Sequence, residues 1–395
     1  MKKILIAFSS LCIATSLFGH ENMQERVDNL EKEMQEVSTV TAYDTIGAGF
    51  TTARPEVEGK NFFITFDILY WHAKIGGTEY AYSYNPQIIY DQQDVPFLLP
   101  ARDGRTKDHD FDWEWGLKAG LGYNISYDGW DVYAQYTWYE SNSSSQSAKE
   151  PPAGLSPLRS FDEMIASKAK SSFDVDYNNV DLEIGRSFYI SSFLSFRPFI
   201  SLKSAWIDLK QDSVYTASPL NDDVFRFFDD PRTNGLDFKV KESCQYWGLG
   251  PRVGVNSHWH LGYGYSIFGD VAGSVLYSYF KTLHRESWPP HTVALIDPEN
   301  GQLFKLRSNF HRFVPYVQIF GGLEWDGYVN HKHQHIRLKL GYEVQYYWRV
   351  NQNFYAEDTT RTGFGTLPEH VRAQFEKTAE DVMFYGITGE FRLDF

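Results

Sequence analysis

The chain has 395 residues, enough for two soluble domains or for one barrel with long loops. Its formal net charge of -14 argues against nucleic acid as a partner. After the first twenty positions it has no run of about 18 or more apolar residues, which excludes a protein that crosses a membrane with helices. Phe, Tyr and Trp make up 17% of the chain, as two aromatic girdles at the edges of a membrane would require.

The first residues have the pattern of a secretory signal peptide. Lys2 and Lys3 precede an apolar run over residues 4–18, which is too short to span a bilayer. We therefore expect a signal peptide over residues 1–19. Its removal would leave Cys244 as the single cysteine of the chain, either buried and inert or available for a bond between chains.

The segment after the signal peptide has a helical pattern. Between Glu21 and Ser38, apolar residues spaced by four and three form an a/d seam flanked by charges. About two heptads are too few to hold chains together unaided. We expect a periplasmic helical segment over residues 20–40, which either supports a homo-oligomer such as a trimer or is a surface helix. A linker over residues 41–59 follows.

Residues 60–395 alternate between apolar and polar side chains. The first strand is predicted from Lys60 to Ala73. The clearest stretch runs from Ile336 to Trp348, where one face is wholly apolar and the other carries Arg337, Lys339 and Glu343. At roughly 3.3 Å per residue it is longer than most soluble strands and suits a tilted membrane crossing. Alone, it also fits a half-buried strand of a β-sandwich.

Short and long connections alternate along the chain. The predicted short turns are Ser126–Gly129, Ile190–Phe193, His260–Gly264 and Tyr328–His333. The predicted long loops are Gly76–Asp112, Ser143–Lys170, Gln211–Asp237, Leu283–Arg307 and Asn351–Glu380. Outer-membrane barrels have short periplasmic turns, long extracellular loops and an even number of strands.

We therefore predict an all-β fold, a transmembrane antiparallel β-barrel of about ten strands over residues 60–395, with both termini periplasmic. Extra strands around Thr78 to Tyr90 would raise the number to twelve or fourteen. Three prolines fall inside predicted strands, where they remove ladder hydrogen bonds, so bulges or shifted boundaries are expected at Pro198, Pro251 and Pro315.

The last strand ends on an aromatic residue of its apolar face, Phe395. This resembles the carboxy-terminal signal of bacterial outer-membrane barrels, which implies the barrel assembly machinery as a partner. Lipid and lipopolysaccharide of the Gram-negative outer membrane are the other expected partners.

Several segments together resemble the Legionella-type pore-forming major outer-membrane protein family. They are Trp113–Tyr123 continuing into Tyr127–Tyr133, Val180–Arg186, Leu194–Pro198, Ala205–Asp208 and Trp247–Asn256. The resemblance extends from about Phe62 to Phe395. It implies an outer-membrane barrel with porin-like activity, passive diffusion of small hydrophilic solutes or ions, and it brings no catalytic residues.

Charged and polar residues on the second face of the strands are candidates for the lumen. They are Lys118, Asp131, Gln135, Asp181, Glu183, Arg197, Lys203, Arg252, Glu324, Arg337, Lys339, Glu343, Arg349, Glu390 and Arg392. These charges would either line a water-filled pore or pair across a narrow barrel and plug it. The family resemblance favours the pore. On this assignment Leu340→Arg should damage a lipid-facing surface, whereas Glu343→Gln should leave folding intact and change ion selectivity.

Histidines flank two of the predicted periplasmic turns: His258, His260, His331, His333 and His335. Their alternate spacing is compatible with a transition-metal site, although solvated turn residues are the commoner explanation. No cofactor is expected, and the chain has no G-x-S-x-G, P-loop or HExxH motif. Two lesser alternatives stay open. One is a closed structural barrel or adhesin, and the other is a hydrolase built from acidic pairs and a loop histidine, namely Asp222, Asp223, Asp229 and Asp230 with His284 or His291.

Overall fold

The computed structural model describes the part of the chain expected to form the barrel. Its described residues are 52–55, 57, 61–84, 87–90, 96–99, 104–125, 129–150, 153–160, 166–218, 235–287, 302–329, 333–358 and 373–395. The expected signal peptide, the helical segment and most of the linker lie outside them. No helix among the described residues is long and apolar enough to cross a membrane.

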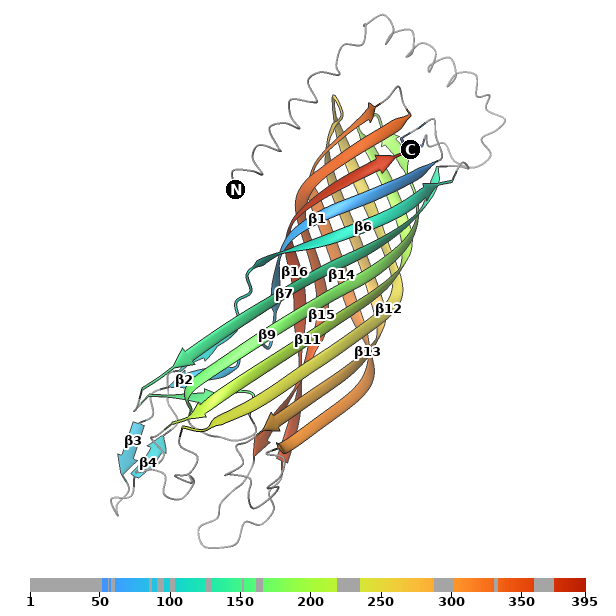
Figure 1. Ribbon diagram of the computed structural model, residues 1–395. Helices are drawn as coiled ribbons and strands as arrows, with labels where there is room; N and C mark the ends of the chain where they lie inside the picture. Colours follow the sequence, from blue (N-terminus) through green and yellow to red (C-terminus); the bar gives the residue numbers. More distant parts are fainter. Residues whose placement is uncertain are drawn as a thin grey trace, which may run out of the picture. The chain divides into compact units, whose positions relative to one another are not determined.

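Ten long antiparallel strands form a closed ring (Figure 1). In ring order they are β1 (Phe62–Ile75), β6 (Trp113–Asn124), β7 (Trp130–Ala148), β9 (Ala166–Arg186), β11 (Leu194–Ala217), β12 (Asp237–Gly262), β13 (Tyr265–Ser287), β14 (Gln302–Val329), β15 (Gln334–Asp358) and β16 (Ala373–Asp394). Each strand is hydrogen-bonded to the next, and β16 pairs with β1, so the ring has no open edge. The predicted ten-stranded antiparallel barrel is confirmed.

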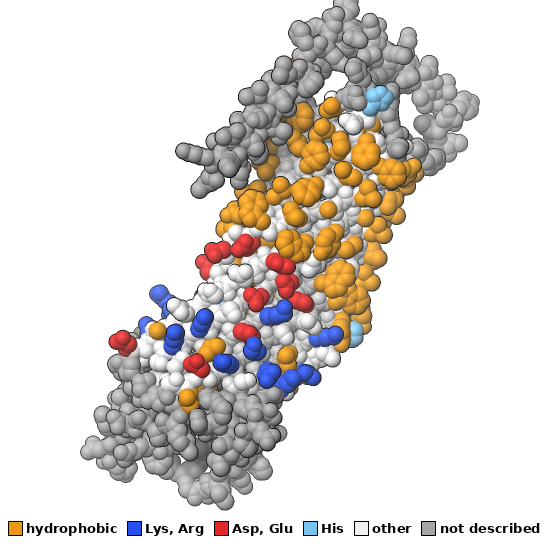
Figure 2. Space-filling view, viewed as in Figure 1, with side chains coloured by type: hydrophobic (Ala, Val, Ile, Leu, Met, Phe, Trp, Pro, Cys, Tyr) orange, Lys and Arg blue, Asp and Glu red, His pale blue; other side chains and the backbone are white. Residues whose placement is uncertain are grey.

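Alternation along each strand separates an outer face from an inner face. On β1 the side chains of Phe62, Ile64, Phe66 and Ile68 are exposed, while Thr65 between them is buried. All ten strands carry exposed apolar side chains, which together we call the apolar belt; Figure 2 shows them gathered on one face of the barrel. Its members include Ile68, Leu121, Tyr136, Leu182, Leu202, Leu249, Val271, Leu323, Leu340 and Ile387. Such a belt is the surface that a barrel presents to lipid.

Leu340 tests the orientation of the strands. Its side chain is 63% exposed in the belt, opposite Leu323 and Gly389 on the neighbouring strands. Leu340→Arg should lower the free energy of unfolding by about 2–4 kcal/mol, because the guanidinium would have to leave water for hydrocarbon. Urea unfolding in lipid vesicles measures this change, with Leu340→Ile as the apolar control. An Arg variant as stable as the control would mean that this face does not meet lipid.

The strands continue further beyond the belt than the sequence predicts. The predicted loop Ser143–Lys170 is too long at both ends, because β7 continues to Ala148 and β9 begins at Ala166. Here the inward Ser141 and Ser143 are buried, while the outward residues are also polar and meet water. With polar residues on both faces, the contrast that identifies a strand disappears. β11, β13 and β15 also run on into the long loops predicted after them, whereas β1 ends at Ile75, just before its predicted loop.

Short strands add to the sheet outside the ring. β2 (Ala81–Tyr84), β5 (Gly104–Lys107) and β8 (Gly154–Pro157) extend it from β9, and β10 (Phe188–Ser191) pairs with β11. β3 (Gln87–Tyr90) and β4 (Pro96–Leu99) form a separate pair. The expected extra strands near residues 78–90 therefore exist, but they leave the ring at ten.

Each strand proline lies where one of its two ladders stops, because proline has no N–H to donate. Pro198 lies just before the first β9–β11 pair, Phe199 with Gly185, and Pro251 lies where the β12–β13 ladder is interrupted and then resumes in unchanged register. Of the two expected outcomes, a bulge or a shifted boundary, the bulge is absent at both positions. At Pro315 the β14–β15 ladder ends altogether.

The wall of the barrel is therefore split beyond the pair Tyr316–Tyr347. Past this pair β14 continues with β13 alone and β15 with β16 alone, and the β15–β16 register shifts between Tyr347 and Asn351. In this bulge Arg349 has a φ of 56°, and both Trp348 and Arg349 are exposed. Placing Arg349 in the lumen was wrong, because the bulge turns its side chain outward.

Candidate functional site

The barrel interior contains a charged cavity toward the short turns, which we call the charged chamber. Its volume is about 250 Å³. Seven cationic side chains line it, those of Arg54, Lys118, Arg197, Arg252, Arg337, Lys339 and Arg392. Seven acidic side chains also line it, those of Asp67, Asp131, Glu183, Asp270, Glu324, Asp326 and Glu390. The equal numbers leave its wall close to electrically balanced.

The strand alternation placed most of these residues correctly on the inner face. Eleven of the fourteen strand candidates other than Arg349 line the chamber: Lys118, Asp131, Gln135, Glu183, Arg197, Arg252, Glu324, Arg337, Lys339, Glu390 and Arg392. The other three, Asp181, Lys203 and Glu343, are also buried in the interior. Their role in a pore stays a prediction.

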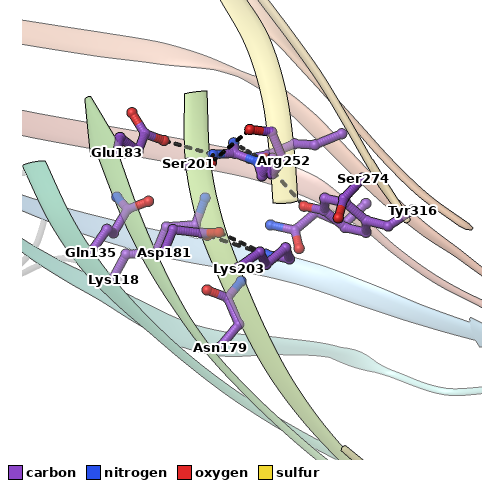
Figure 3. Close-up of polar contacts among 12 residues, drawn as sticks. Lys118, Gln135, Asn179, Asp181, Glu183, Ser201, Lys203, Arg252, Ser274 and Tyr316 are labelled. Carbon is purple, nitrogen blue, oxygen red and sulfur yellow. Dashed lines mark hydrogen bonds and ion pairs between the residues drawn. The ribbon is translucent and has the colours of Figure 1, made fainter. Parts of the chain in front are cut away.

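Arginines link the chamber's carboxylates. Arg197 Nε donates to Asp131 Oδ2 at 2.9 Å, and its Nη1 lies 3.1 Å from Glu183 Oε2. Arg252 donates to the other oxygen of Glu183 at 2.6 Å and to Gln318 Oε1 at 2.7 Å. Figure 3 shows Arg252 of β12 reaching Ser201 on the adjacent strand β11 and Glu183 on β9, one strand further along the ring. The shared carboxylates hold these side chains in fixed positions.

Two further ion pairs lie deeper in the barrel. Lys203 Nζ is 3.1 Å from Asp181 Oδ2, and Lys118 Nζ is 2.6 Å from Glu343. Figure 3 shows Lys203 and Asp181 pointing toward each other from adjacent strands. Thr388 also donates to Glu343 at 2.9 Å. The first pair joins the adjacent strands β11 and β9, whereas the second reaches from β6 to β15 past two intervening strands, and each neutralises its charges in the interior.

The histidines near the short turns bind to side chains of the protein. His258 Nδ1 lies 3.0 Å from Glu324 Oε2. His260 is bound by two serine hydroxyls, and His335 lies 3.1 Å from Asp326 and 3.3 Å from Asp394. His333 lies in the turn before β15, and His331 lies outside the described residues. Within the described part of the chain, no three His, Cys, Asp or Glu side chains could hold a metal ion.

Above the chamber, buried aromatic side chains fill the interior. We call them the aromatic layer: Trp71, Tyr139, Tyr177, Tyr246, Tyr316, Tyr347 and Phe384. Rings from separated strands meet within it, since Tyr177 of β9 stacks on Phe384 of β16 with centroids 4.6 Å apart and lies 5.9 Å from the ring of Tyr347 on β15. Tyr347 in turn contacts Tyr316, its partner on the adjacent strand β14, at 4.5 Å. Tyr177 also donates its hydroxyl to Gln345 at 2.6 Å. The layer separates the chamber from the long-loop end.

The outer part of β15 contributes to this closure by leaving the wall. Val350, Asn351, Gln352 and Asn353 are all buried, although alternate residues of a wall strand face outward. The thiol of Cys244 on β12 donates to the carbonyl of Val350 at 3.4 Å, and β15 contacts both β12 and β13, which are not its neighbours in the ring. The split beside β14 is thus the result of the β15–β16 hairpin leaning into the lumen.

Beyond the aromatic layer, segments between strands dock inside the wall. Arg159 donates to the carbonyl of Glu79 at 2.7 Å and approaches Glu242 at 3.6 Å. On β13, Lys281 is the first exposed charged residue past the apolar belt, and His284 lies three residues further toward the loops. The Nδ1 atom of His284 lies 3.1 Å from Glu242 Oε1, and its Nε2 atom lies 2.9 Å from Glu286 Oε1. Burial alone would lower the pKa of His284, but the hydrogen bonds to both glutamates outweigh it and raise the pKa to about 9.

His109, in the connection before β6, docks in the same region. Its ring nitrogens lie 3.3 Å from Ser143 Oγ and 2.9 Å from Ser171 Oγ. Burial, together with the charge of Arg159, lowers the pKa of His109 to about 4, so the ring is neutral near pH 7. His284, the hydrolase candidate, is therefore enclosed by glutamates, while the acidic pairs and His291 lie outside the described residues.

Some residues of the charged chamber were not among the sequence candidates. Arg54 has no signal in the sequence, because it falls in the predicted linker; it lines the chamber next to Thr52, which forms a β-bridge with Phe188. Asp67 and Asp270 share the parity of the other inward residues, so a stricter use of the alternation would have found them.

A closed antiparallel ring with an apolar belt outside and ion pairs inside defines a transmembrane β-barrel of the bacterial outer-membrane type. The sequence model of the family described as "Legionella pneumophila major outer membrane protein precursor" matches residues 54–395. The chain belongs to this family, as its resembling segments led us to expect, and it is an outer-membrane protein.

Two solved structures are similar to the chain at a low level. The Pseudomonas putida toluene transporter TodX has 8% sequence identity and a TM-score of 0.27, and the match covers 85% of this chain and 90% of that one. A Pseudomonas aeruginosa FadL homologue has 8% identity and a TM-score of 0.24, with the same coverage. Likeness at this level says nothing of function. No curated protein sequence matches the chain.

Proposed function

We propose that the protein is a gated outer-membrane channel for small hydrophilic solutes or ions, closed in the state described. The observation that carries this proposal is the charged chamber, whose walls lie inside the apolar belt. Charged side chains facing a lumen set its selectivity. A barrel that only scaffolds the envelope gains little from such charges, because removing an ion pair from water costs about as much as the pairing returns.

The gate in this proposal is the outer half of the β15–β16 hairpin. It makes no ladder with β14 past Tyr347, so it can move without breaking β14 from β13. The bulge between Tyr347 and Asn351 supplies a hinge at its base. Swinging this hairpin back toward the wall would withdraw Val350 from the lumen and open a path past the aromatic layer.

A disulfide tests the gate. Val350→Cys places a second thiol beside Cys244, whose Sγ lies 3.4 Å from the Val350 carbonyl. In planar bilayers the refolded wild type should show stepwise openings. The oxidised variant should lose nearly all of them and regain them on reduction, because the cross-link holds the hairpin inside.

The control variant combines Val350→Cys with Cys244→Ser and should not respond to oxidant. Equal conductance of the cross-linked and reduced forms would reject the hairpin as gate. A wild type that never conducts would reject the channel.

The second candidate function is a closed structural barrel. The aromatic layer favours it, since seven buried rings fill the cross-section. The bilayer experiment separates the two, because a scaffold gives no openings under any condition.

For the channel, the balanced chamber charges lead us to expect weak preference between cations and anions.

We extend three further expectations as proposals. The long loops face outward and both termini face the periplasm, as in other outer-membrane barrels. Phe395, which pairs with Phe62 through backbone hydrogen bonds of 2.9 and 3.1 Å, ends the strand that the assembly machinery recognises. Oligomerisation through Glu21 to Ser38 concerns residues outside the described ones.

A further inference from the structure

The split in the wall forms a crevice at the lipid-facing side of the barrel, which Arg312, a residue of inward parity, borders through the split. Arg312, Phe313 and Pro315 of β14 line one side, and Trp348 and Arg349 of β15 line the other. The volume of this wall crevice is about 380 Å³, within the lower range for small-ligand sites. It exists because the ladder stops at Pro315 and the hairpin turns inward.

The wall crevice lies at the long-loop edge of the apolar belt. Phe313 is 65% exposed and Trp348 37% exposed on the outer face. The next outward residues of β14 toward the loops are all polar, namely His311, Asn309 and Arg307. Trp side chains concentrate at this depth, where hydrocarbon gives way to headgroups. An occupant here therefore meets apolar side chains on one side and the headgroup layer on the other.

The crevice also carries two positive charges. Among the described residues, neither the Arg312 nor the Arg349 guanidinium forms an ion pair, and the charge that acts on Arg312 is that of another cation, Lys377. The nearest acidic side chain in the bulge is Asp381, which accepts the backbone N–H of Arg349 at 2.7 Å and the hydroxyl of Tyr346. Its oxygens are engaged without meeting either guanidinium. The charge of the site is thus complementary to an anion.

We propose that the wall crevice binds lipopolysaccharide, with one acyl chain against Phe313, Pro315 and Trp348 and a lipid phosphate held by Arg312 and Arg349. Guanidinium groups bind phosphate through paired hydrogen bonds, and an apolar slot beside them accepts the chain attached to it. Lipopolysaccharide occupies the outer leaflet, so this assignment rests on the proposed outward orientation of the long loops.

Binding to the refolded full-length protein in detergent tests the site without requiring conductance. Native mass spectrometry with purified lipopolysaccharide gives the dissociation constant. The double variant Arg312→Gln, Arg349→Gln should weaken binding by about tenfold or more, because both charge-assisted contacts are lost. The matched control Lys305→Gln, Arg307→Gln removes the same charge from the outward face of β14 further from the belt and should leave binding unchanged.

Three ligands identify the occupant. Dephosphorylated lipopolysaccharide should bind the wild type as weakly as intact lipopolysaccharide binds the double variant, and inorganic phosphate alone should not compete. Phosphatidylglycerol bound in preference to lipopolysaccharide would overturn the proposal. Equal binding by the two double variants would show that the crevice arginines have no part in it, whatever the bilayer recordings give. Phe313→Asn, which keeps both arginines, should also weaken binding, and an unchanged constant would reject the acyl-chain slot.

Discussion

Glu343→Gln should lower the free energy of unfolding by about 3–5 kcal/mol, the usual effect of removing one partner of a buried ion pair. Glu343 is fully buried and Lys118 is 3% exposed, with 2.6 Å between the ammonium and each carboxylate oxygen. Gln318 and Gln345 also donate to the same carboxylate, at 2.7 and 2.8 Å. An amide would leave Lys118 charged and unpaired inside the barrel, so the expectation that this substitution spares folding is withdrawn.

Urea unfolding in lipid vesicles measures the change. The double variant Lys118→Met, Glu343→Gln should recover most of the loss, because no buried charge is then left without a partner. As a matched control, Asp212→Asn removes the acid of an ion pair with Lys241 that lies at 3.0 Å but on the exposed surface. It should cost less than about 1 kcal/mol. Equal losses at Glu343 and Asp212 would mean that water reaches the deeper pair.

The outer wall of this barrel is readable from sequence because lipid imposes a rule on every second residue. Phe62, Leu121 and Leu340 sit in the belt as their alternation requires. Beyond the belt both faces of a strand are polar, so the apolar–polar alternation that identifies a strand is absent. For this reason the end of β7 and the start of β9 were placed wrongly.

The interior obeys no such rule. Tyr347 sits on the largely charged face of its stretch, and nothing in its neighbours predicts that it meets Tyr177. Tyr316 is its partner on the adjacent strand β14, but Tyr177 lies on β9, far away in the chain, so that contact depends on ring order and register. A single sequence contains the parity of each residue but not the pairing across the lumen. The charged chamber was therefore predicted as a set of residues, whereas the aromatic layer and the inward hairpin were not.

Removing the central contact of the aromatic layer should open the barrel. Tyr177 and Phe384 stack in the layer, and Phe384 also contacts Trp71 and Tyr139. The variant Tyr177→Ala, Phe384→Ala leaves a gap bordered by the amides of Asn179 and Gln345, which now bind the Tyr177 hydroxyl. A gap with polar groups on its rim takes up water, unlike a purely apolar one. The chamber would then be joined to the outer half of the lumen.

Planar-bilayer recording should show this variant open about tenfold more of the time than the wild type, if the layer contributes at least about 1.4 kcal/mol to closure. The matched control is Phe268→Ala, Phe320→Ala, a buried interior pair 4.7 Å apart that lies outside the layer. Both variants lose buried rings and should be destabilised by several kcal/mol, so each is recorded only from its folded fraction. Equal conductance of the two would place the barrier elsewhere in the barrel. Because the control changes stability alone and the layer variant changes stability and closure together, a difference in open time between them assigns the barrier to the rings that cross the lumen.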